Sequence, residues 1–234
     1  MRHVAEGTGS GGQQAGPLGR LLYDRPPMAR ALPSFDPGPA PAEPGPLFVD
    51  WLLQALAEDV PDAQVVTLST VDADGRPDAR VLALRDVDAA RGAWWFAADA
   101  DSPKGRQLAA TPWAAISVYW PAQGRQVRLR GRVEAAPADR AAAEFRRRSP
   151  ASRTASLVGR QSEPLDGAGE LAAAWDEAAA LLDREPDAVA PGHTLYALLA
   201  DEVEFWQGAP DRRHVRLVYT RGADGGWRRG LLWP

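Results

Sequence analysis

The feature of this sequence that most restricts its fold is a series of short strand-like segments joined by tight turns. Residues 64–71 are apolar and largely β-branched, and the turn Asp72-Ala73-Asp74-Gly75 leads directly into a second such segment at 78–85. Glycine at the end of that turn can adopt a positive φ at little cost. The pattern therefore predicts an antiparallel β-hairpin.

The same arrangement continues along the chain. Strict alternation in Gln126-Val127-Arg128-Leu129-Arg130 gives one polar and one apolar strand face. Further strands are predicted at 93–98, 114–120, 126–134, 194–205 and 214–221, with a last one within 227–234. Helical spacing of apolar residues predicts helices at 47–57, 104–110, 138–147 and 170–184. Hairpins with helices inserted between them predict an α+β fold, an antiparallel β-barrel with peripheral helices.

The N-terminal segment differs in composition from the rest of the chain. Residues 1–45 are rich in Gly, Pro and Ala, so they can bury little apolar surface. We expect this tail to be disordered or loosely draped, and the folded domain to span 46–234. The sequence has neither a run of 18 apolar residues nor the apolar region of a secretory signal. We therefore expect no membrane association and a cytoplasmic protein.

Composition excludes several kinds of site. Cysteine is absent, which rules out disulfides, thiol catalysis and cysteine-ligated metals, and three scattered histidines make a multi-histidine metal site implausible. A net charge of −4 argues against a general nucleic-acid binder. Arginines nonetheless gather in two groups, which favours local sites for anionic ligands. The groups are Arg146, Arg147, Arg148, Arg153 and Arg160, then Arg212, Arg213 and Arg216.

No general catalytic motif is present: the sequence lacks a Walker loop, a G-x-S-x-G elbow, a zinc signature and a dinucleotide-binding G-x-G-x-x-G. The information about function lies instead in several short segments and in the order in which they follow one another along the sequence. They are Arg80-Val81-Leu82-Ala83-Leu84-Arg85, Ser102-Pro103-Lys104-Gly105, Gly124-Arg125-Gln126-Val127, Arg160-Gln161-Ser162 and Glu204-Phe205-Trp206-Gln207-Gly208, the last continuing to Arg212-Arg213-His214-Val215-Arg216. In this order they resemble the pyridoxamine 5'-phosphate oxidase family over roughly residues 46–234.

This resemblance implies a split β-barrel, a homodimer with FMN at the subunit interface, and a specific reaction. The reaction would oxidise pyridoxamine or pyridoxine 5'-phosphate to pyridoxal 5'-phosphate, with O2 as the electron acceptor. The FMN-binding residues would be Arg80, Val81, Leu84, Arg85, Ala97, Ala98, Lys104, Gln126, Gln161, Ser162, Trp206 and Arg216. Arginine and lysine suit a phosphate, and amide side chains suit the donors and acceptors of a flavin ring edge.

The resemblance also implies a substrate site. Its residues would be Arg85, Glu144, Arg148, Ser152, Arg212 and His214. Arg148 and Ser152 would hold the phosphate, while Arg212 and His214 would form the catalytic pair that orients the pyridine ring. Taken alone, each of these residues is more often structural, and only their joint order favours a site.

The sequence departs from the family pattern at several of these positions. Arg85 replaces a lysine, Pro103 an arginine, and the Ala97-Ala98 pair a tyrosine and a threonine. Glu144 replaces a tyrosine that contacts the substrate phosphate. A carboxylate there would repel a phosphate unless it pointed away or paired with Arg146, Arg147 or Arg148.

Three functions remain open at this point. The first is oxidation of the vitamer phosphates, which the retained Arg148, Ser152, Arg212 and His214 favour. The second is a related FMN-dependent oxidase of secondary metabolism, of the phenazine-biosynthesis type, which Glu144 favours. The third is a non-catalytic flavin or haem carrier on the same barrel, which would show no turnover in air.

Overall fold

The computed structural model describes residues 16–234, so the part of the predicted disordered tail at 1–15 lies outside the described residues. The short helix α1 (Pro17–Tyr23) buries none of its residues. The chain that follows packs on the domain: Met28 is buried, Phe35 meets Trp51 edge-on at 5.0 Å, and the Tyr219 hydroxyl donates to the carbonyl of Pro41. This segment has no regular structure, yet it lies along the barrel.

Eight antiparallel strands form one sheet that closes on itself. They are β1 (Val65–Val71), β2 (Pro77–Asp88), β3 (Ala93–Asp99), β4 (Trp113–Trp120), β5 (Arg125–Ala135), β6 (His193–Gln207), β7 (Val215–Arg221) and β8 (Trp227–Leu231). Their order is β3-β2-β1-β4-β5-β6-β7-β8, and a further pairing of β3 with β6 closes a barrel of six strands. The predicted α+β split barrel is confirmed.

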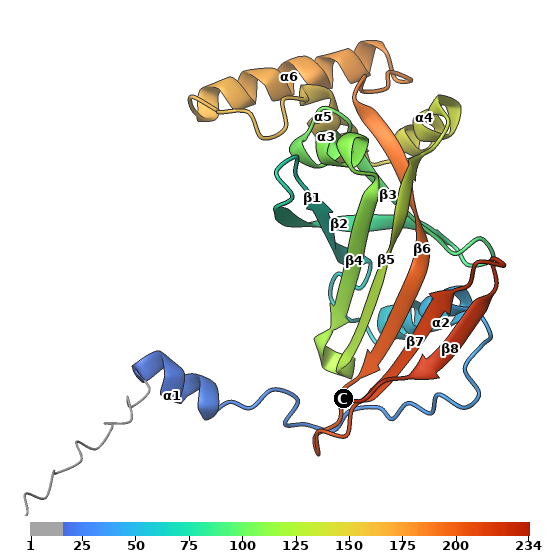
Figure 1. The fold of residues 1–234 in the computed structure, drawn as a ribbon. Helices are drawn as coiled ribbons and strands as arrows, with labels where there is room; N and C mark the ends of the chain where they lie inside the picture. The colour runs from blue at the N-terminus through green and yellow to red at the C-terminus, as the bar shows by residue number, and fades with distance from the viewer. Residues whose placement is uncertain (1–15) are drawn as a thin grey trace, which may run out of the picture.

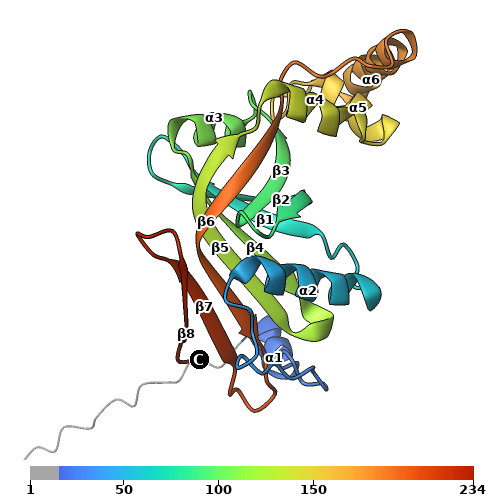
Figure 2. The same cartoon turned by 90° about the vertical axis from the view of Figure 1, so that its right-hand side faces the viewer.

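Apart from α1, the α-helices occupy two regions (Figures 1 and 2). Four of them, α3 (Pro103–Ala110), α4 (Ala138–Arg146), α5 (Pro150–Val158) and α6 (Ala168–Arg184), gather at one end of the long strands. Helix α2 (Pro44–Ala57) and the β7–β8 hairpin lie towards the other end. Within the described part of the chain, no helix combines the length and hydropathy that crossing a membrane requires.

Helix α2 closes the barrel with aromatic side chains. Phe48 meets Trp94 edge-on at 5.6 Å, and Trp51 meets Phe205 at 5.2 Å. All four rings are at most 2% exposed, and the Trp120 indole donates to the carbonyl of Ala63 beside them. Edge-to-face pairs of this kind add to the stabilisation that burial provides. The amphipathic spacing of this helix in the sequence thus reflects its contact with the barrel core.

Strand β6 changes partners and faces halfway along its length. Its first half pairs with β3, its second half with β7, and it pairs with β5 along nearly its whole length. The register with β5 shifts between Arg130 and Gly131, which leaves Asp201 as the extra residue of a β-bulge. Residues 196, 198 and 200 face the core before the bulge, and 203 and 205 do so after it. The bulge therefore lets one strand serve two sheet surfaces.

The close approach at this bulge yields the first prediction. A Cβ on Gly131 would overlap the carbonyl oxygen of Leu199 and lie 2.8 Å from the Ala200 Cα. Gly131→Ala should lower the free energy of unfolding by about 1–3 kcal/mol, measured by chemical denaturation. Gly230→Ala on β8, with open space around its Cα, is the matched control and should change it by less than about 0.5 kcal/mol. Equal effects of the two substitutions would contradict the assignment.

Candidate active site

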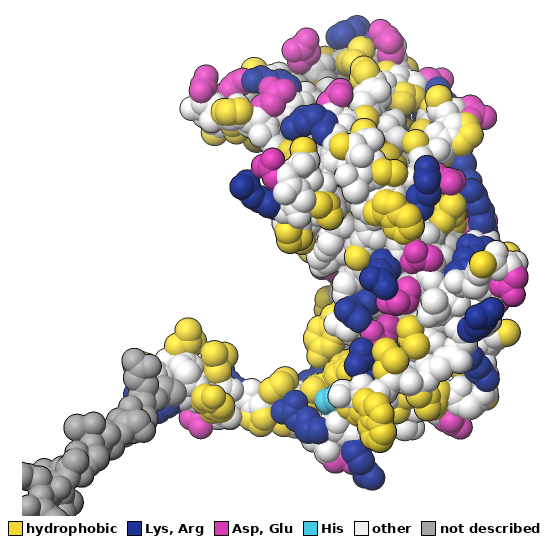
Figure 3. Space-filling view, viewed as in Figure 1, with side chains coloured by type: hydrophobic (Ala, Val, Ile, Leu, Met, Phe, Trp, Pro, Cys, Tyr) yellow, Lys and Arg dark blue, Asp and Glu magenta, His cyan; other side chains and the backbone are white. Residues whose placement is uncertain are grey.

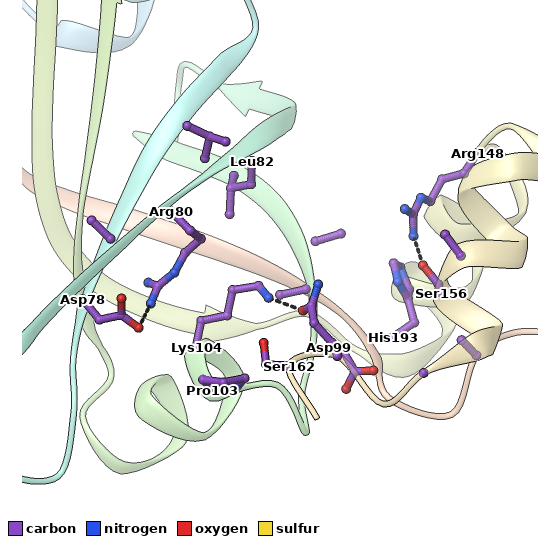
Figure 4. Close-up of a pocket in the computed structure, with 18 residues that line it drawn as sticks. Asp78, Arg80, Leu82, Asp99, Pro103, Lys104, Arg148, Ser156, Ser162 and His193 are labelled. Carbon is purple, nitrogen blue, oxygen red and sulfur yellow. Dashed lines mark hydrogen bonds and ion pairs between the residues drawn. The ribbon is translucent and has the colours of Figure 1, made fainter. Parts of the chain in front are cut away.

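A cleft of about 580 Å³ opens between β2, β3 and the start of α3 on one side, and α5 with the loop that follows it on the other. Figure 4 shows Arg80 and Lys104 on one side of it, with Arg148, Ser156 and His193 on the other. The cleft contains eight of the residues predicted from sequence: Arg80, Val81, Ala97, Ala98, Lys104, Arg148, Gln161 and Ser162. Residues from five separate stretches of the sequence therefore converge on one cavity.

Hydrogen bonds and an ion pair with neighbouring side chains hold the Arg80 side chain in place. Its Nη1 donates to Thr70 Oγ1 at 2.6 Å, and its Nη2 forms an ion pair with Asp78. Thr70 is 1% exposed, and its hydroxyl also bonds to Gln107 of α3. Because its contacts come from three elements, this guanidinium is preorganised beside the cavity.

Lys104 is the second cation on this side. It lies in the first turn of α3, whose N-cap Ser102 accepts from the Gly105 amide. Its Nζ donates to Ser102 Oγ at 3.2 Å and to Gln161 Oε1. Burial, and then the positive charge of Arg80, lower the pKa of the Lys104 ammonium. Both effects penalise the charged form, and an anion in the cleft would relieve them.

The loop that carries Gln161 has an unusual backbone. Gly159, Arg160 and Ser162 have φ values of 62°, 54° and 74°. Positive φ is costly for the two non-glycine residues, and such strain clusters at binding sites. Arg160 fastens the loop to the following segment through ion pairs with Glu163 at 2.9 Å and Glu170 at 2.6 Å. The loop is thus tied down with Gln161 and Ser162 facing the cleft.

The opposite side of the cleft is built around Arg148. Its Nη1 donates to Ser156 Oγ at 2.9 Å, and its Nε is buried without a hydrogen-bond partner among the described residues. Burial, and then the charge of Arg85, lower the pKa of this guanidinium. A half-buried cation with an unused buried donor, lining a cavity, favours an anionic ligand at this position.

Glu144 lies next to Arg148, but its direct partners are others. Its carboxylate accepts from His193 Nε2 at 2.8 Å and pairs with Arg85 Nε at 3.4 Å. Arg146, Arg147 and Arg148 are the partners considered for Glu144 from the sequence, whereas the ion pair is made by Arg85, which lies at a bulge in β2 between Leu84 and Asp86. Burial raises the pKa of Glu144, but the His193 hydrogen bond and the arginine charges outweigh it and hold that pKa below its usual value.

Five further predicted residues lie away from the cleft, on β5, β6, β7 and the turn before β7. Gln126, Trp206 and Arg216 form one cross-strand row, and the His214 ring lies 4.8 Å from that of Trp206. Arg212 occupies the turn between β6 and β7 with a φ of 66°. Figure 3 shows basic and acidic side chains mixed over these strands. Within one chain, the predicted site residues therefore form two groups.

Arg216 is fixed by a buried carboxylate. Glu204, only 5% exposed, accepts from Arg216 Nε at 2.7 Å and also pairs with Arg128. Burial raises the pKa of Glu204, but the hydrogen bonds from Arg216 and Arg128 outweigh it and lower that pKa overall. Arg216 Nη1 also donates to the carbonyl of Trp233, so the chain end helps to orient it.

Two predicted residues have other local roles, and the cleft also contains residues that were not anticipated, His193 and Ser156 among them. The Leu84 side chain is part of the barrel core, and Ser152 bonds to Ser149, the N-cap of α5. His193 and Ser156 line the cleft, although a lone histidine or serine gives no signal in a single sequence. Helix α5 itself was not predicted, although Ser149-Pro150 is a typical helix start.

Comparisons with known proteins agree with this architecture. Residues 52–189 match the family model "Pyridoxamine 5'-phosphate oxidase", and residues 193–234 match "Pyridoxine 5'-phosphate oxidase C-terminal dimerisation region". A pyridoxine/pyridoxamine 5'-phosphate oxidase of Hyphomonas neptunium is 39% identical over 189 residues, covering 80% of this chain and 85% of that protein. One of Bordetella petrii is 40% identical over 195 residues, covering 83% and 91%.

Solved structures share the fold. PhzG from Burkholderia lata 383, in complex with tetrahydrophenazine-1-carboxylic acid, has a TM-score of 0.79 and 30% identity, covering 87% of this chain and 99% of its own. An FMN-binding protein of Nostoc punctiforme related to pyridoxamine 5'-phosphate oxidase has a TM-score of 0.68 at 22% identity, covering 82% and 97%, which shows the fold alone.

The Glu204 cluster yields the second prediction. Glu204→Gln should lower the free energy of unfolding by about 1–2 kcal/mol at neutral pH, between the values for exposed and fully buried pairs. Glu202→Gln is the matched control, because Glu202 pairs with Arg130 on the same face but is 33% exposed; its effect should be below about 0.5 kcal/mol.

The pH dependence of this difference has a defined sign. Because the pKa of Glu204 is lowered in the folded state, its contribution is present above the usual carboxyl pKa and is lost as pH falls through the lowered value. Denaturation curves at neutral and acidic pH would check this. A difference between wild type and Glu204→Gln that grew on acidification would contradict it.

Proposed function

Since this chain belongs to the pyridoxamine 5'-phosphate oxidase family, we propose that it is an FMN-dependent oxidase of pyridoxamine and pyridoxine 5'-phosphate. The product would be pyridoxal 5'-phosphate, with O2 as the electron acceptor. The observation that carries the proposal is the cleft, which places a fixed pair of cations at one side and a half-buried arginine at the other. A flavin phosphate and a substrate phosphate need separate cationic sites of this kind.

The residues of the cleft fit FMN. Arg80 and Lys104 supply charged donors for one terminal phosphate, and Gln161 and Ser162 supply polar groups beside them. Ala97 and Ala98 of β3 offer backbone groups along the same wall. When bound, FMN would supply the hydride acceptor that no side chain of this protein provides. The protein's own contribution is then to position the substrate and to hold its charges.

His214 is suited to donate a hydrogen bond to the substrate. Its Nδ1 accepts from the Ala209 amide at 3.0 Å, so in the neutral ring the proton is on Nε2. The ring packs on Trp206, which limits its rotation. Arg212, two residues earlier in the same turn, would add a positive charge beside the same ring. These two residues would orient the pyridine of the substrate.

We further propose that the active site forms between two copies of the chain. The cleft and the His214 group lie on different parts of one chain, and the C-terminal residues match a dimerisation region. Val81, Trp113 and Tyr119 are 70%, 49% and 49% exposed on the outside of the barrel, as expected for a surface that another subunit covers. In such a homodimer, the His214 and Arg212 of one subunit would complete the cleft of the other.

A second candidate function rests on Glu144 and on the similarity to PhzG. Glu144 brings a negative charge to the side of the cleft where a substrate phosphate would bind. The PhzG structure contains a ring compound with a carboxylate, which carries one negative charge rather than two. An FMN-dependent oxidase of such a carboxylated ring is therefore the alternative, and assays with both substrate classes separate the two.

The FMN assignment yields the third prediction. Lys104→Ala should weaken FMN binding about 10- to 150-fold, since a charge-assisted bond contributes about 1.5–3 kcal/mol. Riboflavin, which lacks the phosphate, should bind equally to both proteins. Arg106→Ala, on the exposed side of the same helix, is the control and should leave both affinities unchanged. Flavin fluorescence titration measures all of them, and equal losses for FMN and riboflavin would contradict the assignment.

The shared active site yields the fourth prediction. Arg148→Ala should mainly raise the KM for the vitamer phosphates, and Arg212→Ala should lower kcat, each reducing kcat/KM roughly 10- to 100-fold. If each site uses Arg148 of one subunit and Arg212 of the other, refolding an equal mixture restores one intact site per mixed dimer. Measured as kcat/KM, at substrate concentrations well below KM, activity should then recover to about a quarter of the wild-type value. Activity no higher than the mean of the two variants would show that both residues act within one chain or not at all.

A further inference from the structure

Glu144 places a negatively charged carboxylate beside the side of the cleft whose cationic residues are otherwise suited to bind an anion. Its side chain is 16% exposed and lies between His193, which is 2% exposed, and the more accessible Arg85. His193 lines the cleft together with Arg148. Arg148 lies close enough that the charges of Glu144 and Arg148 shift each other's pKa. The carboxylate therefore shares its cationic surroundings with any anion that binds against Arg148.

The two partners of Glu144 differ in how firmly they are held. The His193 side chain is buried, packs against the Phe145 ring at 4.8 Å, and directs Nε2 at the carboxylate. Moving Glu144 away would leave this buried donor unpaired, which is costly. Arg85 is 33% exposed, lies at the β2 bulge, and also borders a small neighbouring cavity with Arg140, Arg147 and Asp86. An incoming anion can therefore draw Arg85 away from Glu144 more easily than it can move Glu144 itself.

We propose that Glu144 is a built-in competitor for the anionic group of the substrate, and that it sets the specificity of this site according to ligand charge. This inference deepens the proposed function and rests on it for the location of the site. Glu144 neutralises part of the charge of Arg85 and Arg148 in the free protein. It also stays in place when the ligand binds, because His193 retains it.

The consequence follows from the charges. Repulsion between the Glu144 carboxylate and a bound anion is proportional to the charge of that anion, so a phosphate dianion is penalised about twice as much as a carboxylate. The site should therefore hold phosphorylated ligands loosely and release them readily. It should also discriminate less between a phosphate and a carboxylate than the same site without Glu144.

The test compares ligand binding to the FMN-loaded protein without turnover. Glu144→Gln removes the charge but keeps an oxygen that can accept from His193. It should tighten binding of pyridoxal 5'-phosphate and of inorganic phosphate by roughly 10-fold or more, and leave unphosphorylated pyridoxal unchanged. Glu144→Asp, which keeps the charge, should bind phosphate as weakly as wild type. Titration calorimetry, or the change in flavin absorbance, gives the dissociation constants.

Controls separate this effect from a general change in charge or stability. Glu134→Gln removes another carboxylate that pairs with an arginine, Arg91 at 3.3 Å, but lines neither the cleft nor the neighbouring cavity, and should leave phosphate binding unchanged. Glu144→Leu is the second neutral variant, to be used if Glu144→Gln does not load FMN. A folded neutral variant that binds phosphate no more tightly than wild type overturns the inference.

The outcome is independent of whether the proposed reaction is correct. If wild type turns over neither vitamer phosphate, yet Glu144→Gln binds inorganic phosphate more tightly, the proposed function fails and Glu144 remains a competitor. If turnover is observed and the neutral variants do not differ from wild type, the proposed function stands and the role of Glu144 is refuted.

Discussion

Strand β6 must pair with three other strands, and the rest of the molecule is arranged around that requirement. It closes the barrel by pairing with β3, supports β7 with its other half, and pairs with β5 on its second edge. One strand can do this only by reversing which of its residues face inward, and the bulge at Asp201 provides that reversal. Gly131 faces the bulge because a side chain there would collide with the backbone of β6.

The same strand separates the two groups of candidate site residues. Its beginning carries His193 into the cleft beside α4 and α5, and its end carries Trp206 into the row with Gln126 and Arg216. In Figure 1 these two ends of β6 lie at opposite ends of the barrel. A single chain therefore holds two separate groups of candidate site residues, and the length of this strand is the reason for our proposal that two chains together complete the site.

Much of this organisation could be predicted from the sequence, because it depends on local patterns. The hairpin turn at 72–75, the alternation at 126–130 and the helical spacing at 47–57 all describe elements that the structure contains. The residues on β2, β3 and α3 that the family resemblance assigned to FMN do line one cleft, and they came from that resemblance rather than from local patterns. The bulges could not be predicted, because they depend on register between strands distant in the sequence. For that reason the contact of Arg85 with Glu144 was missed, as was the position of His193 beside them.

The arginines of the candidate site differ in how completely their charges are paired. Arg80 and Arg216 are each held by a carboxylate and by a second polar group, while Arg148 keeps an unused buried donor and Glu144 takes up part of the charge nearby. The central claim is that such a site positions a vitamer phosphate against FMN. It is tested most directly by adding pyridoxine 5'-phosphate without oxygen to the FMN-loaded protein and recording the visible flavin absorption band. The account predicts that the band bleaches and returns when O2 is admitted, with pyridoxal 5'-phosphate formed; a fully flavinated protein whose band is unchanged by either vitamer phosphate would contradict it.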